Sequence, residues 1–223
     1  MKTKLINLFA ITAIIVAATS CKGEKKNETE ATAAEEVVEA PAAAITYIVD
    51  NESSAIEWTG KKPAGQHVGT ISIAKGKVKT QDGKIQSGSF VIDMTSINVT
   101  DLEGDQKAGL EGHLKGEGEG KEDHFFNVAQ FPNSSFEVTG VSEKDGKAMV
   151  EGNLTIKGIK KNISFPASTS VEGDTMTLNS EVFTINRTDW GVNYGSKSVF
   201  ENLGDKFIND DIELKVSLKA NKA

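Results

Sequence analysis

Apolar and polar residues alternate with a period of two through most of residues 45–220, and this pattern constrains the fold more than any other feature of the sequence. Successive side chains of a β-strand point to opposite faces, so the alternation predicts strands with one apolar face. Clear examples are the stretches 89–94, 148–157 and 212–218. The apolar face of each strand must be buried, whereas the polar face can meet water.

Turn residues divide this pattern into about eight to ten antiparallel strands. Asp145-Gly146 is a strong hairpin signal, and Lys75-Gly76 and residues 172–174 also predict turns. An open sheet of this size would expose long edges and a wide apolar face. The sheet is therefore expected to close into a barrel or fold into a sandwich.

The alternation is interrupted in two places. Apolar residues change parity between 176–178 and 183–185, which predicts a bulge or bend near residues 179–180. Residues 100–131 carry no strand pattern and are rich in glycine and acidic residues. This segment is predicted to be a long loop with one or two short helices, one of them around residues 121–126.

The first residues of the chain have the composition of an export signal. Lys2 and Lys4 precede an apolar stretch, residues 8–18, that is too short for a stable transmembrane helix. Residues 18–21, Ala-Thr-Ser-Cys, then resemble the lipobox of bacterial lipoproteins. Residues 1–20 are thus predicted to be a signal peptide, and Cys21 to carry acyl chains such as palmitate. The chain has one cysteine, which disfavours the alternative of an ordinary secretory signal with a chance cysteine.

Residues 21–44 are predicted to be a lipidated cysteine followed by a flexible tether. They are mostly Lys, Glu, Asn, Thr and Ala, with no aromatic residue. Such a segment cannot bury enough apolar surface to offset the entropy lost on ordering. The alternative is a short Ala/Glu helix at residues 32–40. Residues 45–223 are long enough for one domain with a sizeable core.

The charge of the chain restricts its partners. The net charge is −7, from 25 basic and 32 acidic residues, and removal of Lys2 and Lys4 with the signal peptide would make it −9. An acidic surface argues against binding to nucleic acid and to anionic lipid. Membrane attachment is therefore expected through the N-terminal acyl chains only. Lys22, rather than Asp, follows Cys21, which favours the outer membrane, facing the periplasm, over retention in the inner membrane.

Four motifs, occurring in order and covering essentially residues 45–220, resemble the YceI-like family. They are DHFFNVAQFPNSSFEV (123–138), VEGNLTIKGIKKNISFP (150–166), FTINRTDWGVNYG (183–195) and FINDDIELKVSLKA (207–220). The sequence departs from the family pattern at two places. Asn162 stands where the family usually has proline, and a longer Gly-rich stretch separates His113-Leu114 from Phe125, which indicates an insertion near the mouth of the barrel.

The resemblance implies an all-β fold: an elongated antiparallel lipocalin-like β-barrel of about eight strands, with a long apolar lumen that in some members holds a polyisoprenoid chain. The apolar strand faces would line this lumen, and the family position places Phe125 and Phe126 at its mouth. The residues expected to contact the ligand are Trp58, Phe90, Ile92, Phe125, Phe126, Phe136, Leu154, Ile156, Phe165, Phe183 and Ile185. The alternative is that these side chains simply fill a core, because small barrels can be packed solid.

The sequence offers little for catalysis, so no enzymatic activity and no cofactor are expected. A metal site could be built from a cluster that is close in sequence: His113, Glu117, Glu119, Glu122, Asp123 and His124. Their spacing matches no familiar ligand pattern, and the intervening glycines make a poor rigid site. A solvated acidic loop without metal is therefore favoured.

Arg187 is the chain's only arginine, since all other basic residues are lysines. An arginine offers a planar fork of donors that lysine cannot replace. We expect a structural ion pair at a strand end, with Asp189 or another acid as partner. The alternative is contact with the polar head group of a ligand.

The function expected from these features is binding of a long apolar lipid, a polyisoprenoid or isoprenoid quinone, for sequestration or transport in the cell envelope. One alternative is a stress-related structural or interaction module with a filled barrel and no ligand. A weaker alternative is a metal-dependent enzyme or metal carrier that uses the acidic loop.

Replacement of Cys21 by alanine tests the anchor. The variant lacks the thiol that accepts the diacylglycerol, so it should move from the membrane fraction to the soluble fraction when cells are fractionated. A variant that still sediments with membranes after a high-salt wash would contradict the lipoprotein assignment.

Overall fold

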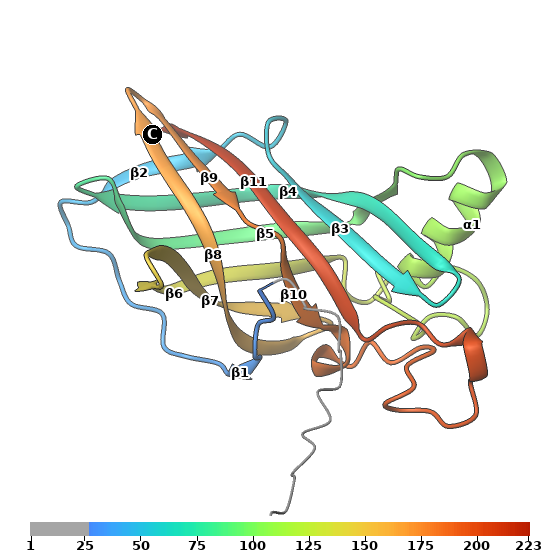
Figure 1. Cartoon of the computed structure of the whole chain (residues 1–223). Coiled ribbons are helices and arrows are strands. Elements are labelled where there is room, and N and C mark those ends of the chain that lie inside the picture. The colour runs from blue at the N-terminus through green and yellow to red at the C-terminus, as the bar shows by residue number, and fades with distance from the viewer. Residues whose placement is uncertain (1–26) are drawn as a thin grey trace, which may run out of the picture.

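The computed structural model describes residues 27–223, so the predicted signal peptide and Cys21 lie outside the described residues. The described chain forms an 11-stranded antiparallel sheet, one α-helix and two short 3-10 helices (Figure 1). The strands are β1 (Thr32–Ala33), β2 (Ile45–Val49), β3 (Ala55–Lys62), β4 (Gly65–Gln81), β5 (Lys84–Val99), β6 (Asn133–Lys144), β7 (Lys147–Ile156), β8 (Ile159–Glu172), β9 (Thr175–Ser180), β10 (Phe183–Asn186) and β11 (Asp211–Lys222). The helices are α1 (Gly104–Lys115), η1 (Arg187–Trp190) and η2 (Gly204–Lys206).

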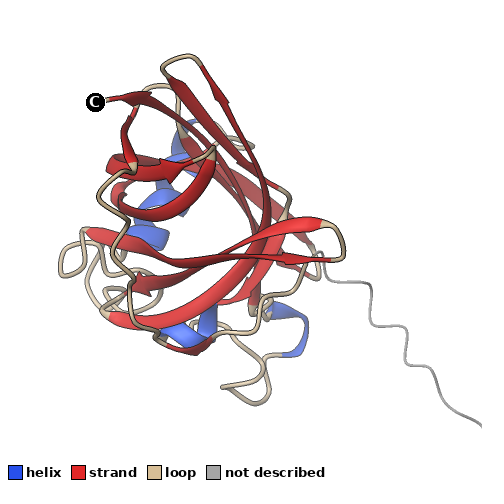
Figure 2. Cartoon of the chain, turned by 90° about the vertical axis from the view of Figure 1, so that its left-hand side faces the viewer, coloured by secondary structure: helices blue, strands red, loops and turns tan. Residues whose placement is uncertain are grey.

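Eight of the strands pair in a closed ring, in the order β3, β4, β5, β6, β7, β8, β9, β11 and back to β3. Figure 2 shows these strands curving around a common interior. The elongated, closed antiparallel fold expected from the sequence is thereby confirmed. β2 and β10 extend the wall beside β11, and α1 lies at one end of the ring (Figure 1).

The hairpin turns are built from residues that tolerate positive φ. Asp145 and Gly146 have φ of 53° and 75° and join β6 to β7, as the sequence predicted. The predicted turn at residues 172–174 is also confirmed, since β8 ends and β9 begins there. The turn predicted at Lys75-Gly76 is wrong. β4 continues through these residues, which pair with Val91 and Phe90 of β5, and a register shift just before them, between Ile73 and Lys75, does not end the strand.

The parity change near residues 179–180 marks a break between two strands. β9 pairs with one stretch of β11 and β10 with an earlier one, so the wall continues across the break. In the gap, the Ser180 hydroxyl accepts a hydrogen bond of 2.7 Å from the backbone N–H of Val216. A side chain thus replaces the missing ladder partner.

Residues 100–131 form the expected loop, but the helix expected around residues 121–126 is wrong. The helix is α1, and it ends at Gly116, whose φ is 80°. The chain then folds back, because the backbone N–H of Phe126 donates to the carbonyl of Leu114 at 3.1 Å. Several glycines with positive φ after α1 favour turns over a second helix.

Several glycines of the ring wall lie against aromatic side chains. A Cβ at Gly152 would come within 2.3 Å of the Phe136 ring, and one at Gly69 within 2.6 Å of the Trp58 indole. A Cβ at Gly76 would come within 2.7 Å of the Phe90 ring, whereas one at Gly88 would make a tight contact of 3.1 Å with the same ring. A side chain at Gly152, Gly69 or Gly76 would therefore force its neighbours to shift.

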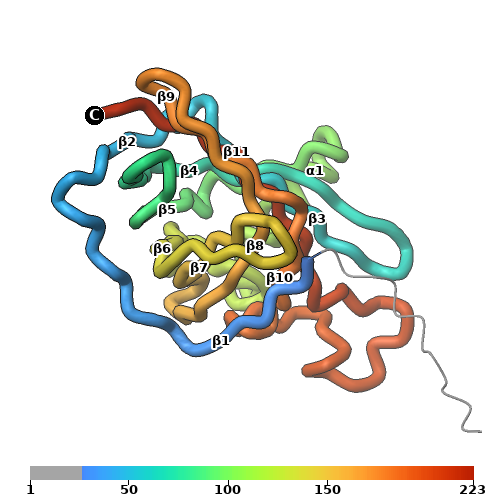
Figure 3. The backbone as a smooth tube through the Cα atoms, turned by 60° about the vertical axis from the view of Figure 1, so that its left-hand side comes forward, coloured from blue at the N-terminus to red at the C-terminus, as the bar shows by residue number. Residues whose placement is uncertain are grey.

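The N-terminal strap, residues 28–35, runs along the outside of the ring (Figure 3). Glu28 bridges to Thr184, and β1 pairs with Lys161 and Asn162 of β8. The amide of Asn153 closes the strap by exchanging two hydrogen bonds, of 2.9 and 2.7 Å, with the backbone of Glu35. The predicted flexible tether therefore does not extend through the strap. Backbone hydrogen bonds to the ring hold residues 28–35 in place, although the segment buries little apolar surface. Among residues 27–223, no helix has the length and apolar character needed to cross a membrane.

Substitution of Asn153 by alanine tests the docking of the strap. Asn153 is 1% exposed and also accepts a hydrogen bond from Asn162, so its loss leaves several buried groups unpaired. The free energy of unfolding, measured in urea, should fall by about 1–3 kcal/mol. Ser170→Ala removes an exposed hydrogen bond to Glu172 and should leave the midpoint nearly unchanged. Coincident transitions for all three proteins would show that the strap is not docked.

Candidate functional site

The ring encloses two neighbouring cavities, of about 300 Å³ and about 80 Å³. The larger cavity extends to α1 and to the segment after η1, at one end of the ring. The smaller cavity is lined by residues of β3 to β11 and does not extend to α1 or to the segment after η1. Ile56, Ile92, Leu154 and Leu214 line both, so the two cavities meet at a shared wall.

The two cavities differ in polarity. Every side chain that lines the smaller one is Ile, Val, Leu or Phe. The larger cavity is also mostly apolar, but its wall includes polar side chains: Lys61, Lys62, His67, His113, Ser134, Arg187 and Asn209. The lumen thus has a wholly apolar inner part and an outer part with polar groups.

All the residues expected to contact a ligand lie on these cavity walls, although contact with a ligand stays a prediction. The larger cavity is lined by Trp58, Phe125, Phe126, Ile156 and Ile185. The smaller cavity is lined by Phe90, Phe136, Phe165 and Phe183, and Ile92 and Leu154 belong to both. Phe165 and Phe183 stack with ring centroids 4.4 Å apart.

The sequence prediction missed several residues of the larger cavity. Met94 shares the parity of Phe90 and Ile92, and Leu214 belongs to the apolar face of the stretch 212–218, so the alternation could have identified both. Ser134 also shares the parity of Phe136, but serine gives no apolar signal. Val192 and Ile208 come from an irregular segment, where no period indicates which side chains point inward.

A cluster of rings lies at the α1 end of the larger cavity. His113, in the last turn of α1, contacts the rings of His124, Phe125 and Tyr194 at centroid distances of 5.0, 5.2 and 4.9 Å. The Nε2 atom of His113 lies 2.7 Å from Nδ1 of His124, within hydrogen-bonding distance. Burial lowers the pKa of His113, and the neighbouring His124 lowers it further. The pair holds the loop after α1 against the mouth of the cavity.

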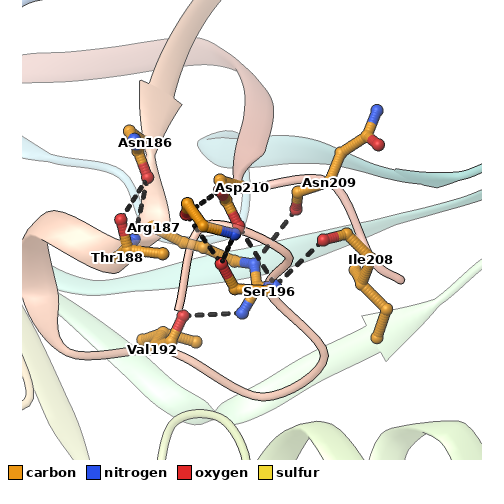
Figure 4. A network of polar contacts seen from close by, with 9 residues as sticks. Asn186, Arg187, Thr188, Val192, Ser196, Ile208, Asn209 and Asp210 are labelled. Carbon is orange, nitrogen blue, oxygen red and sulfur yellow. Dashed lines mark hydrogen bonds and ion pairs between the residues drawn. The ribbon is translucent and has the colours of Figure 1, made fainter. Parts of the chain in front are cut away.

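Arg187 is 2% exposed and ties together the segment after η1 (Figure 4). Its Nε donates to the carbonyl of Asn209 at 3.1 Å, Nη1 to that of Val192 at 2.6 Å, and Nη2 to that of Ile208 at 3.2 Å. The carboxylate of Asp210 lies 3.7 Å from Nη2, so the partner acid is Asp210 and not Asp189. Burial lowers the pKa of Arg187, and Asp210 opposes this effect.

The acidic loop does not assemble a metal site within residues 27–223, where no group of three or more His, Cys, Asp or Glu side chains could hold an ion. His124 faces His113, and Asp123 pairs with Lys157 at 3.4 Å and with Asn127 at 3.0 Å. The third histidine, His67, pairs with Asp101 at 2.9 Å.

Comparisons with known proteins agree with this architecture. A family model described as "YceI-like domain" matches residues 47–220. Proteins described as "UPF0312 protein" from Yersinia pestis and Yersinia pseudotuberculosis are 31% identical over 86 residues, which is 39% of this chain and 38% of each relative. The matched part thus spans well under half the length of these relatives.

Two solved structures share the fold. BcnA of Burkholderia cenocepacia superposes with a TM-score of 0.60 and 23% identity, covering 78% of this chain and 99% of BcnA. A domain of Saccharophagus degradans described as polyisoprenoid binding superposes with a TM-score of 0.56 and 13% identity, covering 80% and 99% of the two chains.

The substitution Arg187→Lys should destabilise the domain although the charge is kept. A single ammonium group cannot reproduce the planar fork that donates to three separate carbonyls, so buried acceptors lose their partners. The expected loss is about 1–3 kcal/mol in the free energy of unfolding, seen as a lower thermal midpoint. An unchanged midpoint would mean that the segment after η1 is held by other contacts.

Proposed function

Because the chain belongs to the YceI-like domain family, we propose that it is an envelope lipoprotein that binds a long apolar lipid, a polyisoprenoid or isoprenoid quinone, inside the ring. The observation that carries the proposal is the pair of adjoining cavities, which together form an apolar lumen inside a closed sheet. The larger one falls in the size range of natural small-molecule sites.

The energetics favour an apolar occupant. The atoms that line an empty apolar cavity lack contacts on one side, and water gains too few hydrogen bonds there to fill it well. A hydrocarbon chain restores these contacts when it moves from water into the cavity. This transfer is favourable by about 0.8 kcal/mol per buried CH₂, before the costs of ordering the chain are subtracted. A chain that is flexible and thin can thread a lumen of this kind.

The structural relative from Saccharophagus degradans, described as polyisoprenoid binding, supports the chemical class of the ligand. The alternative of a filled barrel without ligand requires a lumen packed solid, and the two cavities weigh against it. The polar groups of the site also favour binding over catalysis. Arg187 is engaged by three carbonyls and His113 by His124, so neither is free to activate a substrate.

The proposed location is the outer membrane, facing the periplasm, with attachment through acyl chains on Cys21. The N-terminal strap fixes the chain to the ring from Glu28 onward. Seven residues of fully extended chain, from Cys21 to Glu28, would span roughly 25 Å at most. The domain would therefore stay close to the membrane surface, where an insoluble lipid can be taken up or delivered for sequestration or transport.

Blocking the lumen tests the proposed function. Leu154 lies on the wall common to both cavities and Phe183 lines the inner one, so Leu154→Trp and Phe183→Trp should fill the space that a chain would occupy. Each purified variant should retain several-fold less added long-chain isoprenoid quinone per protein than the wild type, measured by mass spectrometry of an organic extract.

Matched controls lie on the loop after α1, away from both cavity walls. Glu117→Gln and Glu119→Gln should retain as much quinone as the wild type. If folded Trp variants also retain the wild-type amount, the lumen is not the site. If the wild type retains none, the proposed function itself is wrong.

A further inference from the structure

Two buried hydrogen-bonding groups on the wall of the larger cavity have no partner within the described residues. One is the hydroxyl of Ser134, a residue that is 4% exposed, and the other is the indole Nε1 of Trp58. Ser134 occupies an inward position of β6 whose neighbours of the same parity are Phe136 and Val138. A serine at such a position lowers stability compared with an apolar residue unless something accepts its hydrogen bond.

The two groups come from well-separated strands of the ring. Trp58 belongs to β3 and Ser134 to β6, with β4 and β5 between them in the wall. Both residues line the same cavity. The indole N–H can only donate, and the hydroxyl can donate or accept. The complementary group on a ligand is therefore a hydrogen-bond acceptor.

Four other polar side chains on the wall of the larger cavity are already engaged. Arg187 donates to three carbonyls, His113 faces His124, His67 pairs with Asp101, and Lys61 pairs with Glu213. Lys62 is exposed and Asn209 is only partly buried, so Trp58 and Ser134 are the residues of this wall that have a buried polar atom without a hydrogen-bond partner within residues 27–223. The smaller cavity offers no polar side chain at all.

We propose that Trp58 and Ser134 bind an acceptor oxygen, such as a carbonyl or hydroxyl oxygen, on the head of the lipid, so that its hydrocarbon tail points into the smaller cavity. This inference rests on the proposed function and makes it more specific. The lumen selects an oxygen-bearing lipid over a plain hydrocarbon and binds it in one orientation. The shared wall at Ile92 and Leu154 marks where the polar part of the ligand gives way to the apolar part.

The test compares two probes with the same isoprenoid skeleton, a polyprenol and the corresponding hydrocarbon without the hydroxyl. Binding of each probe is measured for the wild type, Ser134→Ala and Trp58→Phe. Both variants should lose about three- to tenfold in affinity for the polyprenol, the worth of one hydrogen bond, and keep their affinity for the hydrocarbon. Ser134→Ala should also melt no lower than the wild type, because it removes an unpaired buried hydroxyl.

Thr155 supplies a matched control. Its hydroxyl is likewise buried without a partner, but it lines neither cavity, so Thr155→Val should leave the preference between the probes unchanged. Equal affinities of the wild type for the two probes, or equal losses for both probes in the variants, would overturn the head-group assignment while leaving lipid binding intact. Failure of the wild type to bind either probe would overturn the proposed function as well.

Discussion

Closure of the sheet through β11 is the constraint on which the rest of this structure depends. A long antiparallel sheet has edges whose N–H and C=O groups need partners, and a ring removes those edges. β11 achieves this by pairing with β3 and β2 along one side and with β10 and β9 along the other. Once the ring is closed, the inward side chains face one another across a shared interior. The lumen is thus a product of backbone hydrogen bonding, and its apolar lining follows from the alternation along each strand.

Two sets of polar interactions hold the loops at the end of the ring where α1 and η1 lie. The His113–His124 pair holds one loop there, and Arg187 holds the other by donating to three carbonyls. These irregular segments cannot be held by a strand ladder, so side chains satisfy their backbone groups. None of these irregular segments lines the smaller cavity, whose wall is wholly apolar.

The sequence predicted those parts of the fold and site that depend on period-two alternation. The closed sheet and the cavity positions of residues such as Phe136 and Leu154 follow from the face on which each side chain lies. The features that were missed depend on contacts between distant segments. The strap docks through backbone pairing and Asn153, which composition cannot reveal. The acid beside Arg187 comes from just before β11, and Ser134 is informative only once its neighbours are known to enclose a cavity. The helix predicted at residues 121–126 does not form because glycine turns and the hydrogen bond from Phe126 to Leu114 decide the conformation of this segment.

The glycines that lie against the aromatic rings of the wall affect how much space is left inside the ring. With no Cβ at Gly152 or Gly69, the rings of Phe136 and Trp58 can lie directly against the backbone of the neighbouring strand. A methyl group at either position would overlap both the ring and a backbone oxygen, that of Glu137 or Asn98, so the wall would have to shift although no lining residue had changed. The space inside the ring therefore depends on the residues that lack a side chain as well as on the apolar residues that line it.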